Sequence, residues 1–563
     1  MAGGRVLKIC VLCAVLSSAL AQEIRVNTTE GVVEGVRAPD GNYFAFYDIP
    51  YAGPTSGENR FKAPTPPPVR TQVFQAINRN TICAQPTSRG LVGTEDCLTL
   101  SVFTQNFTTP KPVLVWLNAE EYTNTPTSTM SYRRLVEEGL VFVTINFRVS
   151  VFGFLCLGVP DAPGNAGLRD IIQGLKWVQA NIANFGGQPG NVMLIGHGSG
   201  AALVDLITMS PQAENLVHKA ITLSGSALAH TAVAYDPVGY AELFGASLSY
   251  TDNSREKLAK LIQTTRTDLL VGALNSFKFT NSTPLFAPCI ENVNLNPNDT
   301  ILADAPINLL RSGKYLQIPY ISAYTTREGT LRAPQAVQDK WLEEMQANFT
   351  NFLPVDIRPG SNLTTVASSI RRFYFSESPI DMATIEDYLE YHGDTLVLVP
   401  IVRAARERGN TSSQSVRLLE FAHRGTFNSD WPFHQIPLSG ARHGAFLNYL
   451  FDFDLRPGDD TARVALVRRI SRFAYTGDPN SPDAPQWNAI TSETVHYNYI
   501  EGNSLLNVSV VYTEGSKMNP HAIRMNFWND TYTRYYVPPP AFSSSNVVSF
   551  SIVLLFCTFI SML

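Results

Sequence analysis

The segment Gly196-His197-Gly198-Ser199-Gly200 has the spacing of a catalytic turn, but a glycine occupies its central position. In the G-x-S-x-G nucleophile elbow, a serine sits on a tight strand-to-helix turn, and small residues two positions away on each side let the chain fold back. Ser199 cannot take the central place, because His197 would then stand where the turn requires a small residue. The pattern therefore predicts the turn of a serine nucleophile without its attacking oxygen.

Short apolar runs bounded by turn residues must position this turn. They cover residues 113–117, 141–145, 192–195 and 319–322, and they are typical of buried parallel strands. Helical patterns lie between them, most clearly at 175–183 and 464–475. No Gly/Ser linker interrupts residues 23–535. We therefore expect one α/β domain over this range, with a mostly parallel central sheet and helices on both faces.

Further motifs share their order with one family. They include Glu95-Asp96-Cys97-Leu98, Asn146-Phe147-Arg148, Pro163 to Asp170, Ser224-Gly225-Ser226 and Gly440-Ala441-Arg442-His443-Gly444. With the altered elbow between them, the sequence resembles the type-B carboxylesterases, the α/β-hydrolase family that includes the cholinesterases. The resemblance covers nearly all of the chain after residue 22, and it implies the α/β-hydrolase fold.

The resemblance places a catalytic triad at Gly198, Glu328 and His443. Such chemistry needs an oxygen nucleophile, a base, an orienting acid and N–H donors for the oxyanion. After the strand that ends at 117 the family carries His-Gly-Gly-Gly, whereas this chain has Asn118, Ala119, Glu120 and Glu121. Loss of the serine lowers turnover by roughly 10⁶-fold in a comparable triad. We therefore expect no competent catalytic residue, and a His443–Glu328 pair that persists for packing.

Two neighbouring side chains are candidate replacements for the missing oxygen. Ser199 should project away from His443, because it is the neighbour of the elbow residue. His197 has a nucleophilic ring, but a packed and hydrogen-bonded histidine is the commoner state of such a residue. An ester hydrolase with an unusual nucleophile, secreted or membrane-bound, is therefore an alternative rather than the main hypothesis.

Several other functions are excluded by what the sequence lacks. Residues 84–96 contain no aromatic side chain, although cholinesterases present an aromatic face to their cationic substrate from this loop. There is no H-E-x-x-H, no cysteine pair at ligand spacing and no P-loop, so we expect neither a metal nor a cofactor. With 43 basic and 48 acidic side chains and no basic tract, nucleic acid is not an expected partner.

The cysteines fit an exported protein. The resemblance pairs Cys83 with Cys97. Cys156 and Cys289 do not match the family's other common bridge, and they either pair with each other or remain free thiols. Sequons add plausible glycan sites, at Asn27, Asn106, Asn281, Asn298, Asn348, Asn362, Asn410, Asn507 and Asn529.

Both ends of the sequence carry signs of export and attachment. Residues 1–22 have the composition of a secretory signal peptide. Residues 536–563 form a Pro/Ser segment and an apolar run that starts at Val547, which resembles a glycosylphosphatidylinositol signal. We predict this lipid anchor at the extracellular face of the plasma membrane, with a C-terminal transmembrane helix or secretion as alternatives. The attachment candidates are Ser543, Ser544, Ser545 and Asn546.

The missing nucleophile and the predicted anchor favour a non-catalytic role. Neuroligins and the insect proteins glutactin, neurotactin and gliotactin resemble esterases without the serine, and they act in cell adhesion or at cell junctions. By this resemblance we expect a catalytically inactive cell-surface glycoprotein that binds an extracellular protein partner. A scavenger that holds a small apolar ligand in the esterase gorge is the other alternative.

Overall fold

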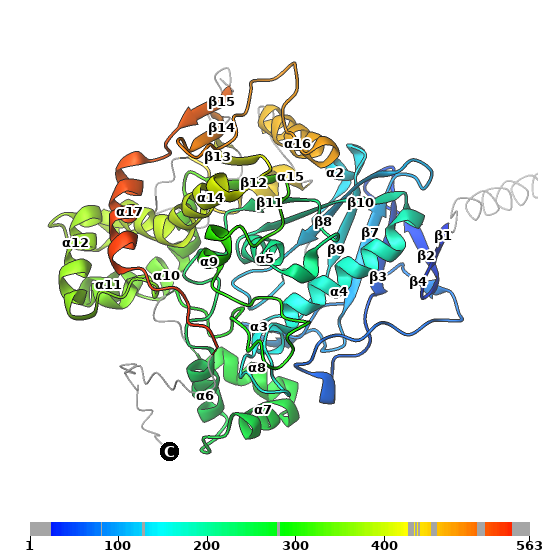
Figure 1. The fold of residues 1–563 in the computed structure, drawn as a ribbon, viewed down its shortest axis with the longest axis horizontal. Helices are drawn as coiled ribbons and strands as arrows, with labels where there is room; N and C mark the ends of the chain where they lie inside the picture. Colours follow the sequence, from blue (N-terminus) through cyan, green and yellow to red (C-terminus); the bar gives the residue numbers. More distant parts are fainter. Residues whose placement is uncertain are drawn as a thin grey trace, which may run out of the picture.

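The computed structural model describes residues 24–79, 81–125, 130–277, 282–425, 433, 436, 440–451, 459–503 and 513–542. In this part of the chain, thirteen strands form one mixed sheet, in the order β1-β2-β3-β7-β9-β8-β10-β11-β12-β13-β14-β15 with β4 beside β2 (Figure 1). Their bounds are β1 Ile24–Thr28, β2 Gly31–Arg37, β3 Phe44–Pro50, β4 Phe74–Gln75, β7 Thr99–Thr104, β8 Lys111–Leu117, β9 Val141–Ile145, β10 Gly187–His197, β11 Lys219–Leu223, β12 Tyr320–Thr325, β13 Val416–Arg424, β14 His496–Asn503 and β15 Thr513–Met518. A separate hairpin pairs β5 (Gln85–Thr87) with β6 (Gly90–Val92).

The centre of the sheet is parallel and its two margins are antiparallel. All neighbours from β9 through β8, β10, β11, β12 and β13 to β14 pair in parallel. Every residue of β11 and β12 is buried, because helices cover both faces of these strands. Val115 of β8 packs in one buried cluster with Ile171 of α4 (Ala166–Asn181), whereas its neighbour Trp116 packs in a second cluster with Leu466 of α16 (Asp459–Thr476). Successive side chains of a strand therefore face two helical layers.

The two longest described helices, α4 and α16, pack against the sheet. The α-helix bounds are α2 Arg133–Glu137, α3 Ser150–Phe154, α4 Ala166–Asn181, α5 Ser199–Thr208, α6 Pro237–Ser247, α7 Arg255–Thr264, α8 Thr267–Ser276, α9 Pro306–Arg311, α10 Ala333–Gln338, α11 Trp341–Ala347, α12 Leu363–Phe375, α13 Ile385–Gly393, α14 Val399–Thr411, α15 Ala445–Leu450, α16 Asp459–Thr476 and α17 Ala522–Tyr535. Among the described residues, no helix is long and apolar enough to cross a membrane.

The predicted strands and helices are present, although their ends differ. Residues 113–117, 141–145, 192–195 and 319–322 fall on β8, β9, β10 and β12. Helix α4 begins at Ala166, nine residues before the predicted pattern. Its first turns contain the buried charged residues Arg169 and Asp170. These side chains interrupt the apolar periodicity by which a helix is recognised, which explains the late predicted start.

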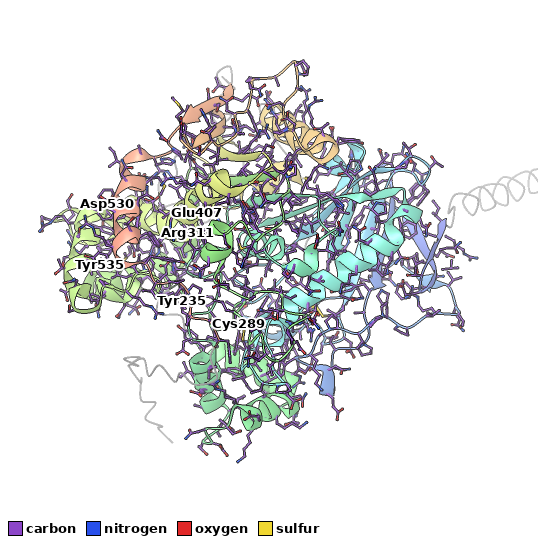
Figure 2. All side chains as sticks on the ribbon, viewed as in Figure 1. Tyr235, Cys289, Arg311, Glu407, Asp530 and Tyr535 are labelled. Carbon is purple, nitrogen blue, oxygen red and sulfur yellow. A yellow bond between two sulfur atoms is a disulfide. The ribbon has the colours of Figure 1, made fainter. Side chains whose placement is uncertain are left out.

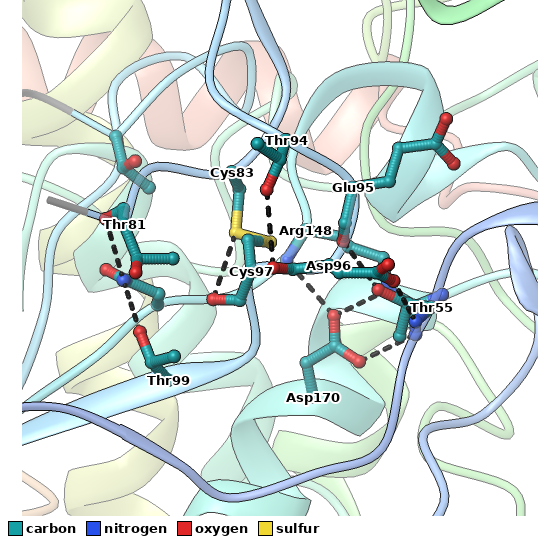
Figure 3. The surroundings of a disulfide bond; sticks show 12 residues. Thr55, Thr81, Cys83, Thr94, Glu95, Asp96, Cys97, Thr99, Arg148 and Asp170 are labelled. Atoms are coloured by element: carbon teal, nitrogen blue, oxygen red, sulfur yellow. Dashed lines mark hydrogen bonds and ion pairs between the residues drawn. A yellow bond between two sulfur atoms is a disulfide. The ribbon is translucent and has the colours of Figure 1, made fainter. Parts of the chain in front are cut away.

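The described residues form two disulfides. Cys156 pairs with Cys289 (labelled in Figure 2), which resolves the alternative that the sequence leaves open. Cys83 pairs with Cys97 as the resemblance implies, and Figure 3 shows the surroundings of this bond. Next to it, the carboxylate of Asp96 accepts the backbone N–H of Thr55 at 2.8 Å. The loop closed by the Cys83–Cys97 disulfide is thereby fixed to the N-terminal part of the domain.

Candidate active site

The elbow has kept its backbone shape around Gly198. Strand β10 ends at His197, α5 begins at Ser199, and Gly198 between them has φ 57° and ψ −124°. Its N–H donates to Leu223 O at 2.9 Å, which ties the turn to β11. Because a positive φ is strained for a residue with a Cβ, glycine releases strain that a serine here would store.

The small residues on either side are required by close packing. A Cβ on Gly196 would lie 2.5 Å from the backbone of Gly200, and one on Gly200 would lie 2.4 Å from Leu117 O. A Cβ on Gly198 is different: among the described residues, it would meet only His443 Nε2 within 4 Å, at 3.8 Å. The place where a serine side chain would begin is therefore open and directed at the histidine.

The predicted base and acid form a hydrogen-bonded pair. His443 Nδ1 lies 2.5 Å from Glu328 Oε2. Glu328 starts the short 3₁₀ helix Glu328–Arg332, and it is buried. Its other oxygen accepts from Ser224 Oγ at 2.7 Å and from Thr325 N at 2.6 Å. The backbone N–H of His443 donates to Thr330 Oγ1 at 2.9 Å. The imidazole is thereby oriented with Nε2 toward position 198.

Two of these supporting residues were not identified as site residues from the sequence. Ser224 belongs to a motif that carries the resemblance, which was the signal that could have found it. Thr330 carries no such signal. Gly225, beside Ser224, packs so closely on the elbow that a Cβ there would lie 2.0 Å from Gly198 O.

Two backbone N–H groups of the loop after β8 already have acceptors. Glu120 N donates to Asn124 O at 2.8 Å. Tyr122 N donates to Ser199 Oγ at 3.3 Å. Glu121 and Tyr122 have φ of 48° and 62°, a left-handed backbone that favours glycine. The loop therefore keeps a glycine-type conformation with bulky residues in it, and the N–H groups of Glu120 and Tyr122 are already occupied.

The two carboxylates that replace the family's glycines have different partners. Glu121 Oε1 lies 2.5 Å from Nη1 of the buried Arg332, whose Nε donates to Ser282 Oγ at 3.2 Å. The Glu120 carboxylate has no hydrogen bond or ion pair within the described part of the chain. Although Glu120 is partly accessible from the cavity, desolvation by its walls raises the pKa of this carboxyl group, and the charge of Glu121 adds to the rise.

His197 does not have the hydrogen-bonded environment that the sequence suggested. Its ring centre lies 4.7 Å from that of His443, and its Nε2 has no hydrogen-bond partner among the described residues. Burial lowers the pKa of His197 well below its ordinary value, and the proximity of His443 lowers it further. His197 is therefore a neutral imidazole packed on the base. Ser199 Oγ, by contrast, accepts the N–H of Tyr122 and faces the loop after β8.

A cavity of about 530 Å³ opens in front of these groups. Its polar side consists of residues 118–122, the elbow and His443. Other lining residues are apolar, namely Trp341, Leu396, Val397, Phe433 and Leu447, and the buried Arg332 also lines the cavity. A cavity of about 700 Å³ between residues 57–60 and 260–268 contains none of the candidate residues. The smaller cavity is thus the one that belongs to the candidate active site.

The structure describes most of the predicted glycosylation sites but not the predicted lipid-attachment residues. Asn27, Asn298, Asn348, Asn362 and Asn410 are exposed, and Asn106 and Asn529 are partly exposed. Asn281, Asn507, the signal segment 1–22 and the attachment candidates Ser543, Ser544, Ser545 and Asn546 lie outside the described residues. Glycosylation and lipid attachment therefore stay predictions.

Comparisons with known proteins agree with this geometry. A model of the carboxylesterase family matches residues 22–528. Venom carboxylesterase-6 of Apis mellifera is 24% identical over 538 residues, which cover 90% of this chain and 93% of that protein. Juvenile hormone esterase of Tribolium castaneum is 26% identical over 545 residues, covering 90% and 91%.

A solved structure supports the same fold. The crystal structure of juvenile hormone esterase from Manduca sexta, with OTFP covalently attached, superposes with a TM-score of 0.80 at 24% identity, and it covers 91% of this chain and all of that one. The predicted α/β-hydrolase fold is confirmed. Because the family model spans far more than half of the sequence, this chain belongs to the carboxylesterase family.

Proposed function

We propose that this chain is a catalytically inactive, membrane-attached surface glycoprotein of the carboxylesterase family that binds a partner. One observation carries the proposal: the base is oriented toward position 198, where Gly198 offers no oxygen. The Glu120 N–H is occupied by Asn124 O, and Glu120 brings a carboxylate to the cavity that Gly198 and His443 also line. Both features oppose ester hydrolysis.

The relatives named above are esterases, so hydrolysis is the function against which the proposal must be tested. The hydroxyl of Ser199, the neighbour of Gly198 in the sequence, already accepts a hydrogen bond from Tyr122 N. A role in adhesion rests on the resemblance to neuroligins, glutactin and neurotactin, together with the predicted anchor and glycans. The binding partner of this role would be another extracellular protein.

The purified ectodomain is expected to give no more p-nitrophenyl ester hydrolysis than its His443→Ala variant, because Gly198 offers the base no oxygen. It should also stay unlabelled by a fluorophosphonate probe, measured by intact-protein mass spectrometry. Stoichiometric labelling that disappears in Ser199→Ala would contradict the proposal and favour a hydrolase with an unusual nucleophile.

The cavity favours a second candidate function, the binding of a small ligand. It measures about 530 Å³, a size common for ligand pockets, and part of its lining is apolar. In its charged form the carboxylate of Glu120, which lines this cavity, attracts a cationic head group and repels an anionic one. A ligand with an apolar body and an amino group suits such a lining.

Glu120→Gln is expected to weaken binding of a dansyl-labelled alkylamine by about tenfold, the loss of about 1.4 kcal/mol of charge-assisted pairing. The same change should not weaken binding of the matching dansyl-labelled fatty acid. Fluorescence titration at neutral pH measures both affinities. Glu343→Gln on α11, which removes an exposed carboxylate outside the cavity, is the matched control. Equal amine affinity in both variants would exclude Glu120 from a ligand site.

A further inference from the structure

The chain leaves the domain along a fixed path. After α17 ends at Tyr535, Tyr536 forms a β-bridge with Ile357. The next residue, Val537, donates its N–H to Asp356 O at 2.9 Å. Its carbonyl accepts from the hydroxyl of Tyr235 at 3.2 Å (Tyr235 and Tyr535 are labelled in Figure 2). Two consecutive residues, Tyr536 and Val537, are thus bound to the domain surface.

The path continues to Phe542. A Cβ added to Gly158 would lie 2.0 Å from the ring of Phe542, so the ring rests directly on this glycine. The guanidinium of Arg255, the first residue of α7, lies 5.8 Å from the same ring centre. Residues 536–542 are therefore a strap that is packed against the domain, and Phe542 holds its end at the helices α6 and α7.

Only four residues separate this fixed point from the apolar run. The run begins at Val547, and residues 543–546 precede it. If the apolar run itself enters the bilayer, the membrane surface lies within about 18 Å of Phe542, the five Cα-to-Cα steps from Phe542 to Val547. If a lipid is attached within residues 543–546, the phosphoethanolamine and glycan of that anchor lengthen this limit. This step rests on the membrane attachment in the proposed function.

The surface around this point suits lipid head groups. Helix α7 exposes Lys257 and Lys260, and α8 exposes Leu269 to 55%. Lys257 pairs with Asp252, whereas Lys260 donates to the neutral side chain of Gln263. None of the described sequon asparagines lies on α6, α7 or α8. Glu256 and Asp268 lie on the same helices, so the charges of this surface are mixed. A surface with charges of both signs, an exposed leucine and no sequon among its described residues can approach zwitterionic lipid head groups.

We propose that the end of the domain formed by α6, α7 and α8 faces the membrane. Phe542 is the last fixed residue before the bilayer, and Arg255 and Lys260 lie on the side of the domain that meets lipid phosphates. The strap gives the domain one orientation on the cell surface. The opposite end, where Figure 1 shows α16, then points away from the cell and toward an extracellular partner.

Energy transfer from single dyes to an acceptor in the outer leaflet of intact cells tests this orientation on the full chain. One dye is placed at Lys257→Cys on α7, and the control dye at Val464→Cys on α16, two exposed positions at opposite ends of the molecule. We expect severalfold more transfer from position 257. Equal transfer, or more transfer from position 464, overturns the proposed orientation.

A second variant tests whether the short connection after Phe542 holds α7 close to the membrane. A flexible Gly/Ser insert of about twenty residues after Phe542 adds a mean span of roughly 25 Å. It should leave the protein on the cell surface and remove most of the difference between the two dyes. An unchanged difference overturns the role of the strap. Recovery of the unmodified chain in the medium instead of on cells overturns the membrane attachment itself, which is distinguishable because no dye is then found at the surface.

Discussion

Gly198→Ser is expected to leave ester turnover at least about 10²-fold below that of the same variant with a restored oxyanion loop. A serine at this position begins in open space and is directed at His443 Nε2. The oxyanion donors remain deficient, because the N–H of Glu120 is held by Asn124 O. Loss of one such donor lowers turnover by around 10² to 10³-fold.

The restored loop combines Gly198→Ser with Ala119→Gly, Glu120→Gly and Glu121→Gly. These changes remove two carboxylates and return glycine to a loop whose φ is 48° at Glu121. The measurement is kcat/KM for a short-chain aryl ester, with His443→Ala in the same background as the control. Turnover in Gly198→Ser alone that matches the restored loop would show that the loop after β8 is already competent.

Asp170→Ala is expected to lower the free energy of unfolding by about 3–5 kcal/mol, because it leaves a buried guanidinium without its counter-charge. Arg148 donates to Asp170 Oδ2 at 2.8 Å and to Oδ1 at 2.6 Å, and the two side chains are 2% and 0% exposed (Figure 3). Arg148 also donates to Arg60 O and Lys62 O, so it cannot turn outward without losing further hydrogen bonds.

Denaturant unfolding under oxidising conditions measures this effect, with both disulfides intact. The control is Asp268→Ala, which removes the partner of Arg266 in an ion pair whose side chains are 77% and 48% exposed. An exposed pair contributes little, since water screens it, and the control should unfold close to the unchanged protein. Similar destabilisation in both variants would mean that the buried pair contributes no more than a surface one.

Local features of the fold could be predicted from the sequence. The strands 113–117, 141–145 and 192–195 are short apolar runs, and such patterns depend only on neighbouring residues. The absence of an oxygen at Gly198 is also fixed by the sequence, because no tertiary arrangement can add a side chain. The positions of Glu328 and His443 required the resemblance to a known family, since nothing in their local sequence brings them together.

Tertiary packing alone decided the remaining features of the site. The Cys156–Cys289 bond joins residues 133 positions apart. The pairing of Glu121 with Arg332 and the contact of Phe542 with Gly158 likewise join segments that are distant in the sequence. Such partners are chosen by the fit of whole elements against one another, and no local periodicity encodes that fit. The sequence by itself therefore determined which chemical groups this protein has, and only the tertiary structure decided which of those groups meet.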